Sequence, residues 1–256
     1  MTHSNRAWWL VALAMAWGCN QVAGVDDLHY VGGTGGTTST SSSSTSAGQG
    51  GSAGGGGTGG SSQPCVVPFT DTFEEGGMSP GWIAFGAGTV GVADGALWLE
   101  PQGTSTAGTG VMSPVIDASG CEVSVELVEA FSSDVPGALA LSVVAFGESW
   151  ASIEIRGGDI YSRVVIVGEL VFEMMTTYDV DDHRWLRIRE GESDGEPEVR
   201  FEASPDGVSW SSLGAATTPL APTQAQVYLW AALSDQVATP ERVRFDNLNN
   251  LPEATP

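Results

Sequence analysis

The sequence predicts an all-β fold, an antiparallel β-sandwich behind a disordered N-terminal tether. Three observations lead to this prediction. Short runs of alternating apolar and polar residues follow one another along the chain, and turn-forming residues separate them at intervals of about 8–12 residues. No stretch after Tyr30 has a convincing helical pattern. We therefore expect about a dozen strands, as in sandwiches and barrels.

The predicted strands can be placed in order along the chain. Apolar runs, most of them alternating with polar residues, lie at 123–128, 139–146, 153–156, 160–167, 170–175, 185–189, 199–203 and 208–213. The run from Leu139 to Phe146 is the most continuous, which is typical of a central strand. Gly157-Gly158-Asp159, Asp194-Gly195 and Ser204-Pro205-Asp206-Gly207 supply turn residues between neighbouring runs.

Composition limits the partners of this domain. The chain has nine basic residues, all Arg, against 31 acidic ones, and a formal charge of -22. Residues 64–256 hold most of this charge, and their field is wrong for phosphate backbones, so we expect no nucleic-acid partner. Anionic lipid is disfavoured for the same reason. About 190 residues remain in this part of the chain, which is enough for one sandwich with a sizeable core.

The first 18 residues are predicted to be a signal peptide. Arg6 precedes an apolar run from Ala7 to Trp17, and about 11 apolar residues are too few to span a membrane. The ending Ala16-Trp17-Gly18-Cys19 resembles the lipobox of bacterial lipoproteins, although Ala16 and Trp17 depart from the usual residues.

The lipobox resemblance implies that Cys19 is acylated and begins the mature protein, whose N-terminal part is 19–31. Asn20 follows it, where an Asp would mark inner-membrane retention. We expect an exported outer-membrane lipoprotein, facing the periplasm or the cell surface, whose contact with the membrane is the lipid anchor. The alternative is ordinary signal-peptide cleavage, which leaves Cys19 as a free thiol.

Residues 32–63 are predicted to be a disordered linker. They are almost entirely Gly, Ser and Thr, and such residues cannot bury enough apolar surface to offset the entropy of ordering. A flexible chain of this length spans about 30 Å. This holds the following domain, 64–256, clear of a membrane surface; glycosylation of the Ser/Thr run is the alternative role.

Two cysteines remain once Cys19 is assigned to lipid. They are Cys65 and Cys121, and an oxidising compartment favours a disulfide between them. Closing a loop of about 57 residues would contribute about 4 kcal/mol in the chain-entropy model.

Several motifs together resemble the concanavalin A-like (LamG-like) jelly rolls. They are FTDTFEEGGMSPGWIAFG, VADGALWLEP, HRWLRIRE, FEASPDGVSW and VRFDNLNN, in this order along residues 64–251. The resemblance implies a jelly-roll β-sandwich of two stacked antiparallel sheets. It also implies a fold that lectins, carbohydrate-binding modules, glycosidases and adhesion domains share.

The sequence predicts that the domain is not an enzyme. His183 is its single histidine and no nucleophile motif accompanies it. Glucanases of this fold carry their carboxylates as E-x-D-x-x-E, and the nearest match is Glu122, Glu126 and Glu129. Spacings of four and three put Glu129 on the opposite strand face, so we interpret these residues as solvent-facing acids.

The resemblance also implies a structural calcium site. Carbohydrate-binding jelly rolls often hold calcium between an acid of the first strand and an Asp of the last. Here these would be Asp71 or Glu74 and Asp246. A second candidate is the acidic loop of residues 179–182, which carries three Asp.

We expect a polysaccharide-binding face built on exposed aromatic rings flanked by hydrogen-bonding groups. The candidates are Trp185 and Arg187 on one strand, Arg200 on its neighbour, and Tyr228 and Trp230 on a third. These residues form one face only if the three strands are adjacent; otherwise the charges stabilise the sheet as cross-strand pairs. We therefore expect a surface lipoprotein that recognises polysaccharide. A structural or adhesive domain and a divergent glycosidase are the alternatives.

Overall fold

The computed structural model describes part of the chain. The described residues are 65–67, 69–74, 77–102, 108–132, 134–145, 147–217, 220, 222–235 and 241–252. The predicted signal peptide, the lipidation site Cys19 and the linker 32–63 lie outside them.

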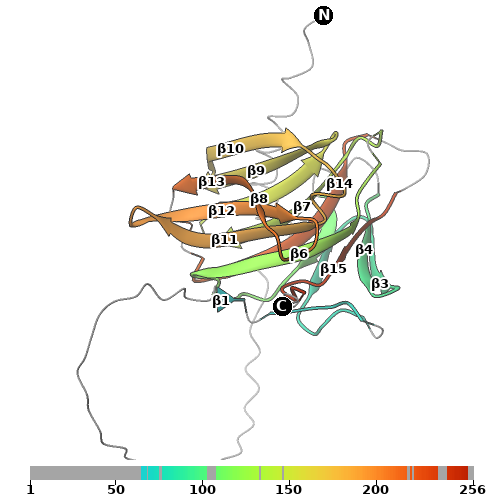
Figure 1. Ribbon diagram of the computed structural model, residues 1–256. Coiled ribbons are helices and arrows are strands. Elements are labelled where there is room, and N and C mark those ends of the chain that lie inside the picture. The colour runs from blue at the N-terminus through green and yellow to red at the C-terminus, as the bar shows by residue number, and fades with distance from the viewer. Residues whose placement is uncertain are drawn as a thin grey trace, which may run out of the picture.

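The described residues form fifteen strands in two sheets. The eight-stranded sheet has the order β13 (Ser211–Thr217), β12 (Glu196–Ser204), β11 (Trp185–Ser193), β6 (Cys121–Glu129), β15 (Val243–Asp246), β4 (Ala96–Glu100) and β3 (Thr89–Ala93), with β1 (Cys65–Val66) beside β6. The seven-stranded sheet has the order β10 (Glu169–Thr177), β9 (Asp159–Ile166), β8 (Ser149–Arg156), β7 (Gly137–Ala145), β14 (Ala225–Leu233), β5 (Thr109–Met112) and β2 (Ile83–Gly86). Figure 1 shows the two sheets as stacked layers.

This architecture confirms the predicted antiparallel sandwich. Each pair of neighbouring strands along both sheets is antiparallel, and only the short β1 runs parallel to its partner β6. The described part of the chain contains no helix long and apolar enough to cross a membrane.

One predicted strand begins later than expected. Val208 was expected to start a strand, but β13 begins at Ser211. The carboxylate of Asp206 accepts hydrogen bonds from the backbone N–H groups of Val208 and Ser209, at 2.8 and 2.7 Å. These bonds extend the turn, because an Asp side chain competes with the sheet for local backbone donors.

The core lies between the sheets and follows the two-residue period of the strands. On β7, Leu139 and Leu141 are fully buried, and their partners on β14 are Ala231 and Leu229, which are also fully buried. Because successive side chains of a strand point to opposite faces, the residues between them point away from the core. The pattern that builds the core therefore also decides which side chains lie on the two outer faces.

The backbone register supports the predicted disulfide. β1 pairs with β6 so that Cys65 and Cys121 are directly opposite each other. Such a pairing brings two Cα atoms to within the range that a disulfide can bridge. The bond stays a prediction, and it would tie the start of the domain to the centre of the eight-stranded sheet.

We expect reduction of the protein, or the substitution Cys121→Ser, to lower the free energy of unfolding by about 2–5 kcal/mol. Denaturant unfolding with and without reductant measures this effect. The variant with both Cys65→Ser and Cys121→Ser is the control, because reductant should then leave its midpoint unchanged. Quantitative thiol labelling that finds both cysteines free in the exported protein would contradict the prediction.

Candidate functional site

The outer face of the seven-stranded sheet carries two aligned rows of side chains, many of them aromatic or charged. The registers across six strands align one row of residues, which is Phe85, Gly110, Trp230, Ala140, Glu154 and Tyr161. The neighbouring row is Ile83, Met112, Tyr228, Ser142, Ser152, Arg163 and Glu173. Both rows alternate with core residues, so their side chains point away from the core.

One half of this face is aromatic. The rings of Phe85 and Tyr228 meet edge to face, with centroids 5.6 Å apart. The indole of Trp230 donates a hydrogen bond to the hydroxyl of Ser142 at 3.3 Å. Gly110 lies between Phe85 and Trp230, and a Cβ there would come within 2.8 Å of both side chains. Because only glycine fits at this point, the aromatic rings can approach one another closely.

The other half is charged. Glu154 is 6 % exposed, and its carboxylate accepts a hydrogen bond from Arg163 at 2.9 Å. Arg163 also pairs with Glu173 at 2.6 Å, and its guanidinium lies 5.1 Å from the centre of the Tyr161 ring. Arg156 lies over the same ring at 4.1 Å and approaches Glu154 to 3.6 Å. These contacts hold the donors of two guanidinium groups in place, since planar Arg forks are fixed by carboxylates and ring faces.

Small residues separate the two halves. Ala140 and Ser142 of β7 are buried, although their side chains are on the outer face. Rings on one side and anchored charges on the other, with short side chains between them, suit a flat polar ligand with apolar faces. A sugar ring has this character, because its C–H groups stack on aromatic rings while its hydroxyls take part in hydrogen bonds.

The outer face of the eight-stranded sheet is charged in a different way. Arg187 of β11 pairs with Glu122 of β6 at 3.1 Å and with Glu202 of β12 at 2.7 Å. Arg189 also bonds Glu202, and Arg200 is paired with Glu198. Burial would raise the pKa of Glu202, but hydrogen bonds from Arg189 and the charges of both Arg residues lower it overall. These charges therefore stabilise the sheet as cross-strand pairs, which was the alternative to a sugar-binding face.

The structure does not bring the five predicted sugar-binding residues together, so the expectation of one common face is wrong. Tyr228 and Trp230 do share a face, that of the seven-stranded sheet. Trp185, Arg187 and Arg200 lie on β11 and β12 of the other sheet. The physical reason is the strand order, because β14 inserts between β7 and β5 and its outer face points away from β11.

Sequence reasoning missed Phe85, Glu154 and Arg163 of the outer face. A signal for Glu154 was present, because Ile153 and Ile155 alternate with it and mark it as outward-facing. The Gly157-Gly158 turn is also a hairpin signal that would place Glu154 near Arg163 on consecutive strands. No signal in the sequence could place Phe85 near Tyr228, because that contact depends on strand order.

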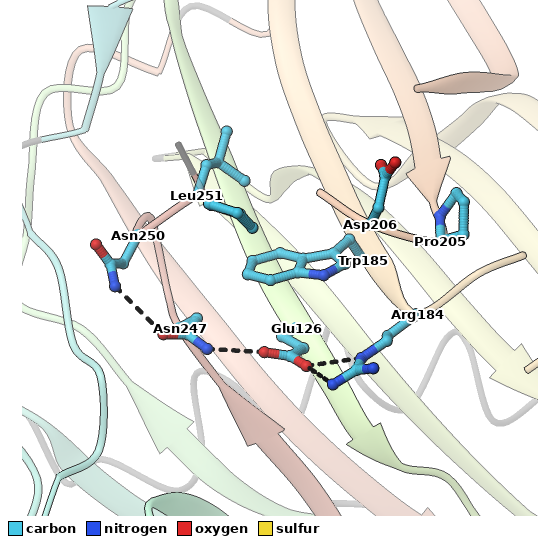
Figure 2. A pocket seen from close by; sticks show the side chains of 9 residues that line it. Glu126, Arg184, Trp185, Pro205, Asp206, Asn247, Asn250 and Leu251 are labelled. Carbon is cyan, nitrogen blue, oxygen red and sulfur yellow. Dashed lines mark hydrogen bonds and ion pairs between the residues drawn. The ribbon is translucent and has the colours of Figure 1, made fainter. Parts of the chain in front are cut away.

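A second feature is an open pocket at one end of the eight-stranded sheet, shown in Figure 2. Its volume is about 530 Å³, and its lining includes Glu126, Arg184, Trp185, Asp206, Asn247 and Asn250. Glu126 accepts hydrogen bonds from Arg184 and from Asn247, both at 2.7 Å. Of the five predicted sugar-binding residues, Trp185 lines this pocket and the other four do not.

The histidine and the acidic loop before β11 have structural roles. The Nδ1 atom of His183 accepts a hydrogen bond from the backbone of Asp179 at 2.9 Å, and its ring stacks on Tyr178. Burial lowers the pKa of His183, against the opposing charges of Asp182 and Asp179. The carboxylate of Asp179 accepts bonds from the N–H groups of Asp181 and Asp182. These contacts shape a turn, as Asp side chains commonly do.

The predicted calcium ligands fit an ion poorly. Both carboxylate oxygens of Asp71 already accept hydrogen bonds, from the N–H groups of Phe73 and Ser79 and from the indole of Trp82. Burial raises the pKa of Asp246, and the charges of Glu126 and Glu74 raise it further. In the described ranges, no three or more His, Cys, Asp or Glu side chains are grouped so that they could hold a metal ion. A site at Glu74 and Asp246 stays a prediction.

Comparisons with known proteins identify the fold. No family model matches the sequence, and no curated protein does either. A laminarinase from Flavobacterium sp. UMI-01 superposes with a TM-score of 0.53 at 8 % identity, covering 71 % of this chain and 98 % of that one. A non-specific endo-β-1,3(4)-glucanase of family GH16 gives 0.50 at 11 % identity, over 71 % and 89 % of the chains.

A third solved structure is a GlcNAcα1-4Gal-releasing endo-β-galactosidase from Clostridium perfringens. It gives a TM-score of 0.50 at 6 % identity, over 72 % of this chain and 62 % of that one. At these identities the likeness shows the fold alone, and it confirms the jelly-roll β-sandwich.

The same comparisons correct the expectation that the domain is not an enzyme. The three solved structures are glycoside hydrolases, so the fold of this chain is one on which polysaccharides are cleaved. The exclusion rested on the lack of a nucleophile motif beside His183 and on the spacing of Glu122, Glu126 and Glu129, which were interpreted as solvent-facing acids. On β6, Glu122 and Glu126 are instead buried, at 2 % and 6 % exposed. That strand lies in the eight-stranded sheet, whereas Glu154 lies on the aromatic face of the other sheet.

We expect the substitution Asp246→Asn to raise Tm at neutral pH. Because the folded-state pKa of Asp246 is raised, this group lowers stability as pH rises above its ordinary value of 3.8. The amide can keep the oxygen that accepts the N–H of Asn247 at 2.7 Å. Thermal melts of both proteins in chelator, at neutral pH and near pH 3, measure the effect. The gain should vanish at the lower pH, and an equal gain at both would contradict the electrostatic cause.

The same melts test calcium. If Glu74 and Asp246 hold an ion, added calcium should raise Tm of the unmodified chain and leave that of Asp246→Asn unchanged. Identical midpoints in calcium and in chelator would exclude a structural calcium ion.

Proposed function

We propose that this chain recognises polysaccharide through the outer face of the seven-stranded sheet. The observation that carries the proposal is the pairing of an aromatic cluster with anchored charges on one face. Phe85, Tyr228 and Trp230 offer ring surfaces, and Arg163 and Glu154 offer hydrogen-bonding groups beside them. A neutral polysaccharide suits this face best, because a chain of formal charge -22 repels polyanions.

The solved structures with the same fold support this ligand class. They include a laminarinase and an endo-β-1,3(4)-glucanase, both named for their action on polysaccharides. The fold places two extended sheets back to back, so each sheet offers a broad outer face to a long ligand. On the eight-stranded sheet, Arg187, Arg189 and Arg200 are engaged by glutamates of the same sheet. The seven-stranded sheet combines such pairs with a cluster of rings.

We further propose that the protein acts outside the cytoplasm as a lipid-anchored outer-membrane protein. The apolar run after Arg6, the cysteine at position 19 and the Gly/Ser/Thr segment support this proposal. A tether of this composition lets a domain search for a large, immobile ligand such as a polysaccharide.

The substitution Trp230→Ala should weaken polysaccharide binding by about 2 kcal/mol or more, roughly 30-fold, because a central aromatic ring carries much of such binding energy. Affinity electrophoresis or calorimetry of the full chain against laminarin, mixed-linkage β-glucan, xylan and galactan measures this loss. Trp98→Ala is the matched control, since Trp98 is also half-buried and on an outer face, but of the other sheet, beneath Arg242.

The same samples are assayed for newly formed reducing ends, because the fold is shared with glycoside hydrolases. Cleavage that Trp230→Ala abolishes and Trp98→Ala keeps would also assign this face as the polysaccharide site. Equal binding by both variants, or no binding to any of the four polysaccharides, would overturn the proposal.

The lipid anchor has a direct test in cells. Metabolic labelling with an alkyne fatty acid should tag the full chain in a bacterial host, and Cys19→Ser should lose the tag. Cys121→Ser is the control, because a cysteine within the folded domain should not affect acylation. Labelling that persists in Cys19→Ser would contradict the anchor.

A further inference from the structure

The pocket in Figure 2 is a built site, separate from the face discussed above. Glu126 of β6, Arg184 and Trp185 at the start of β11, Asp206 of the turn after β12, and Asn247 after β15 converge on it. All belong to the eight-stranded sheet or its connections. The outer face of the seven-stranded sheet is on the opposite side of the core, so the two sites share no residue.

The indole of Trp185 is the first sign that a ligand belongs here. Trp185 is 4 % exposed and lies at the centre of the pocket lining in Figure 2. In the described part of the chain its Nε1–H makes no hydrogen bond to protein, and the nitrogen itself is reached by solvent. Buried indole N–H groups usually find an acceptor. Water therefore satisfies this donor in the free protein, and an acceptor atom of a ligand can replace that water.

The polar groups around the indole are held in place by one another. Arg184 and Asn247 each donate to the carboxylate of Glu126, whose side chain is 8 % exposed. Asn250 donates to Asn247 at 3.2 Å. This chain of contacts fixes the amides and the guanidinium at the pocket wall before any ligand arrives. Preorganised groups of this kind lose little entropy on binding.

The charges at the pocket disfavour anionic ligands. Glu126 neutralises Arg184, which leaves Asp206 as the unpaired charge. Backbone N–H groups of Ser209 and Val208 lower the pKa of Asp206 to about 2, so it is ionised at neutral pH. An anion would be repelled by Asp206 and by the whole domain.

The geometry points to a neutral sugar: we propose that this pocket binds a single uncharged sugar ring, as a second carbohydrate site of the protein. Pro205, Leu251 and Pro252 give it apolar walls beside the indole. The ring's hydroxyls would accept from Trp185 and donate to Asp206. A volume of about 530 Å³ in an open depression is ample for one ring, so the site fits a chain end or a side branch. The opposite face suits a longer segment.

The test follows the indole N–H signals of the isotopically labelled full chain by NMR. Trp185→Phe identifies the Trp185 signal, because it removes the N–H and keeps an aromatic ring in the core. We expect at least one of D-glucose, D-galactose, D-mannose and N-acetylglucosamine to shift this signal saturably. Asn250→Ala, an exposed position, should weaken that response about tenfold. Trp210→Phe should not, because Trp210 lies beneath Arg187 away from the pocket.

Acetate and inorganic phosphate serve as anionic probes. No saturable shift with any of the four sugars, or a shift with the anions alone, would overturn the inference. An unchanged response in Asn250→Ala would do the same.

The outcome is separable from that of the proposed function. Trp230→Ala should weaken binding at the seven-stranded sheet and leave the Trp185 response intact. Failure at one site therefore leaves the result at the other unaffected.

Discussion

The packing of apolar side chains between the two sheets is the interaction on which the rest of this structure depends. Strand side chains alternate between faces, so each residue committed to the core sends its neighbours outward. Leu139 and Leu141 of β7 are buried between the sheets, and Ser142 is thereby placed on the outer face beside Trp230. The residues committed to the core thus decide which side chains point outward on both sheets. A shift of register by one residue would exchange core and surface throughout a strand.

The two outer faces differ in the side chains that cover them. On the eight-stranded sheet, buried carboxylates such as Glu122 are compensated by arginines of adjacent strands, and burial still raises the pKa of Glu122. Such pairs add little to the free energy of folding, because desolvation offsets their attraction. Their main effect is to favour one register of neighbouring strands. On the seven-stranded sheet, one cluster of this kind, at Glu154 and Arg163, stands beside the rings of Phe85 and Tyr228, which contact each other edge to face. Because of this difference, we propose the outer face of the seven-stranded sheet, and not that of the eight-stranded sheet, as the polysaccharide surface.

Two sugar sites on opposite sides of one domain would have a consequence for avidity. A polysaccharide chain bound along one face and a chain end held in the pocket would be joined by a rigid sandwich. Linked sites bind a multivalent ligand more tightly than either site alone, provided that both can be engaged together. A matrix of many chains satisfies this condition easily, whereas a short soluble oligosaccharide does not.

By itself, the sequence determined the all-β sandwich, the order of most strands along the chain and the alternation that separates core from surface. These are local properties, because apolar period and turn residues act over a few positions. It also placed Tyr228 and Trp230 on one face, since they are two residues apart on a strand. The start of β13 was misplaced because one side chain, Asp206, extends a turn.

Only the tertiary structure decided which strands are neighbours. That choice separated Trp185 from Trp230 and brought Glu126, Arg184 and Asn247 around one pocket. The physical reason is that strand order in a sandwich depends on contacts between residues far apart in the chain. Such contacts leave no periodic signal along the sequence.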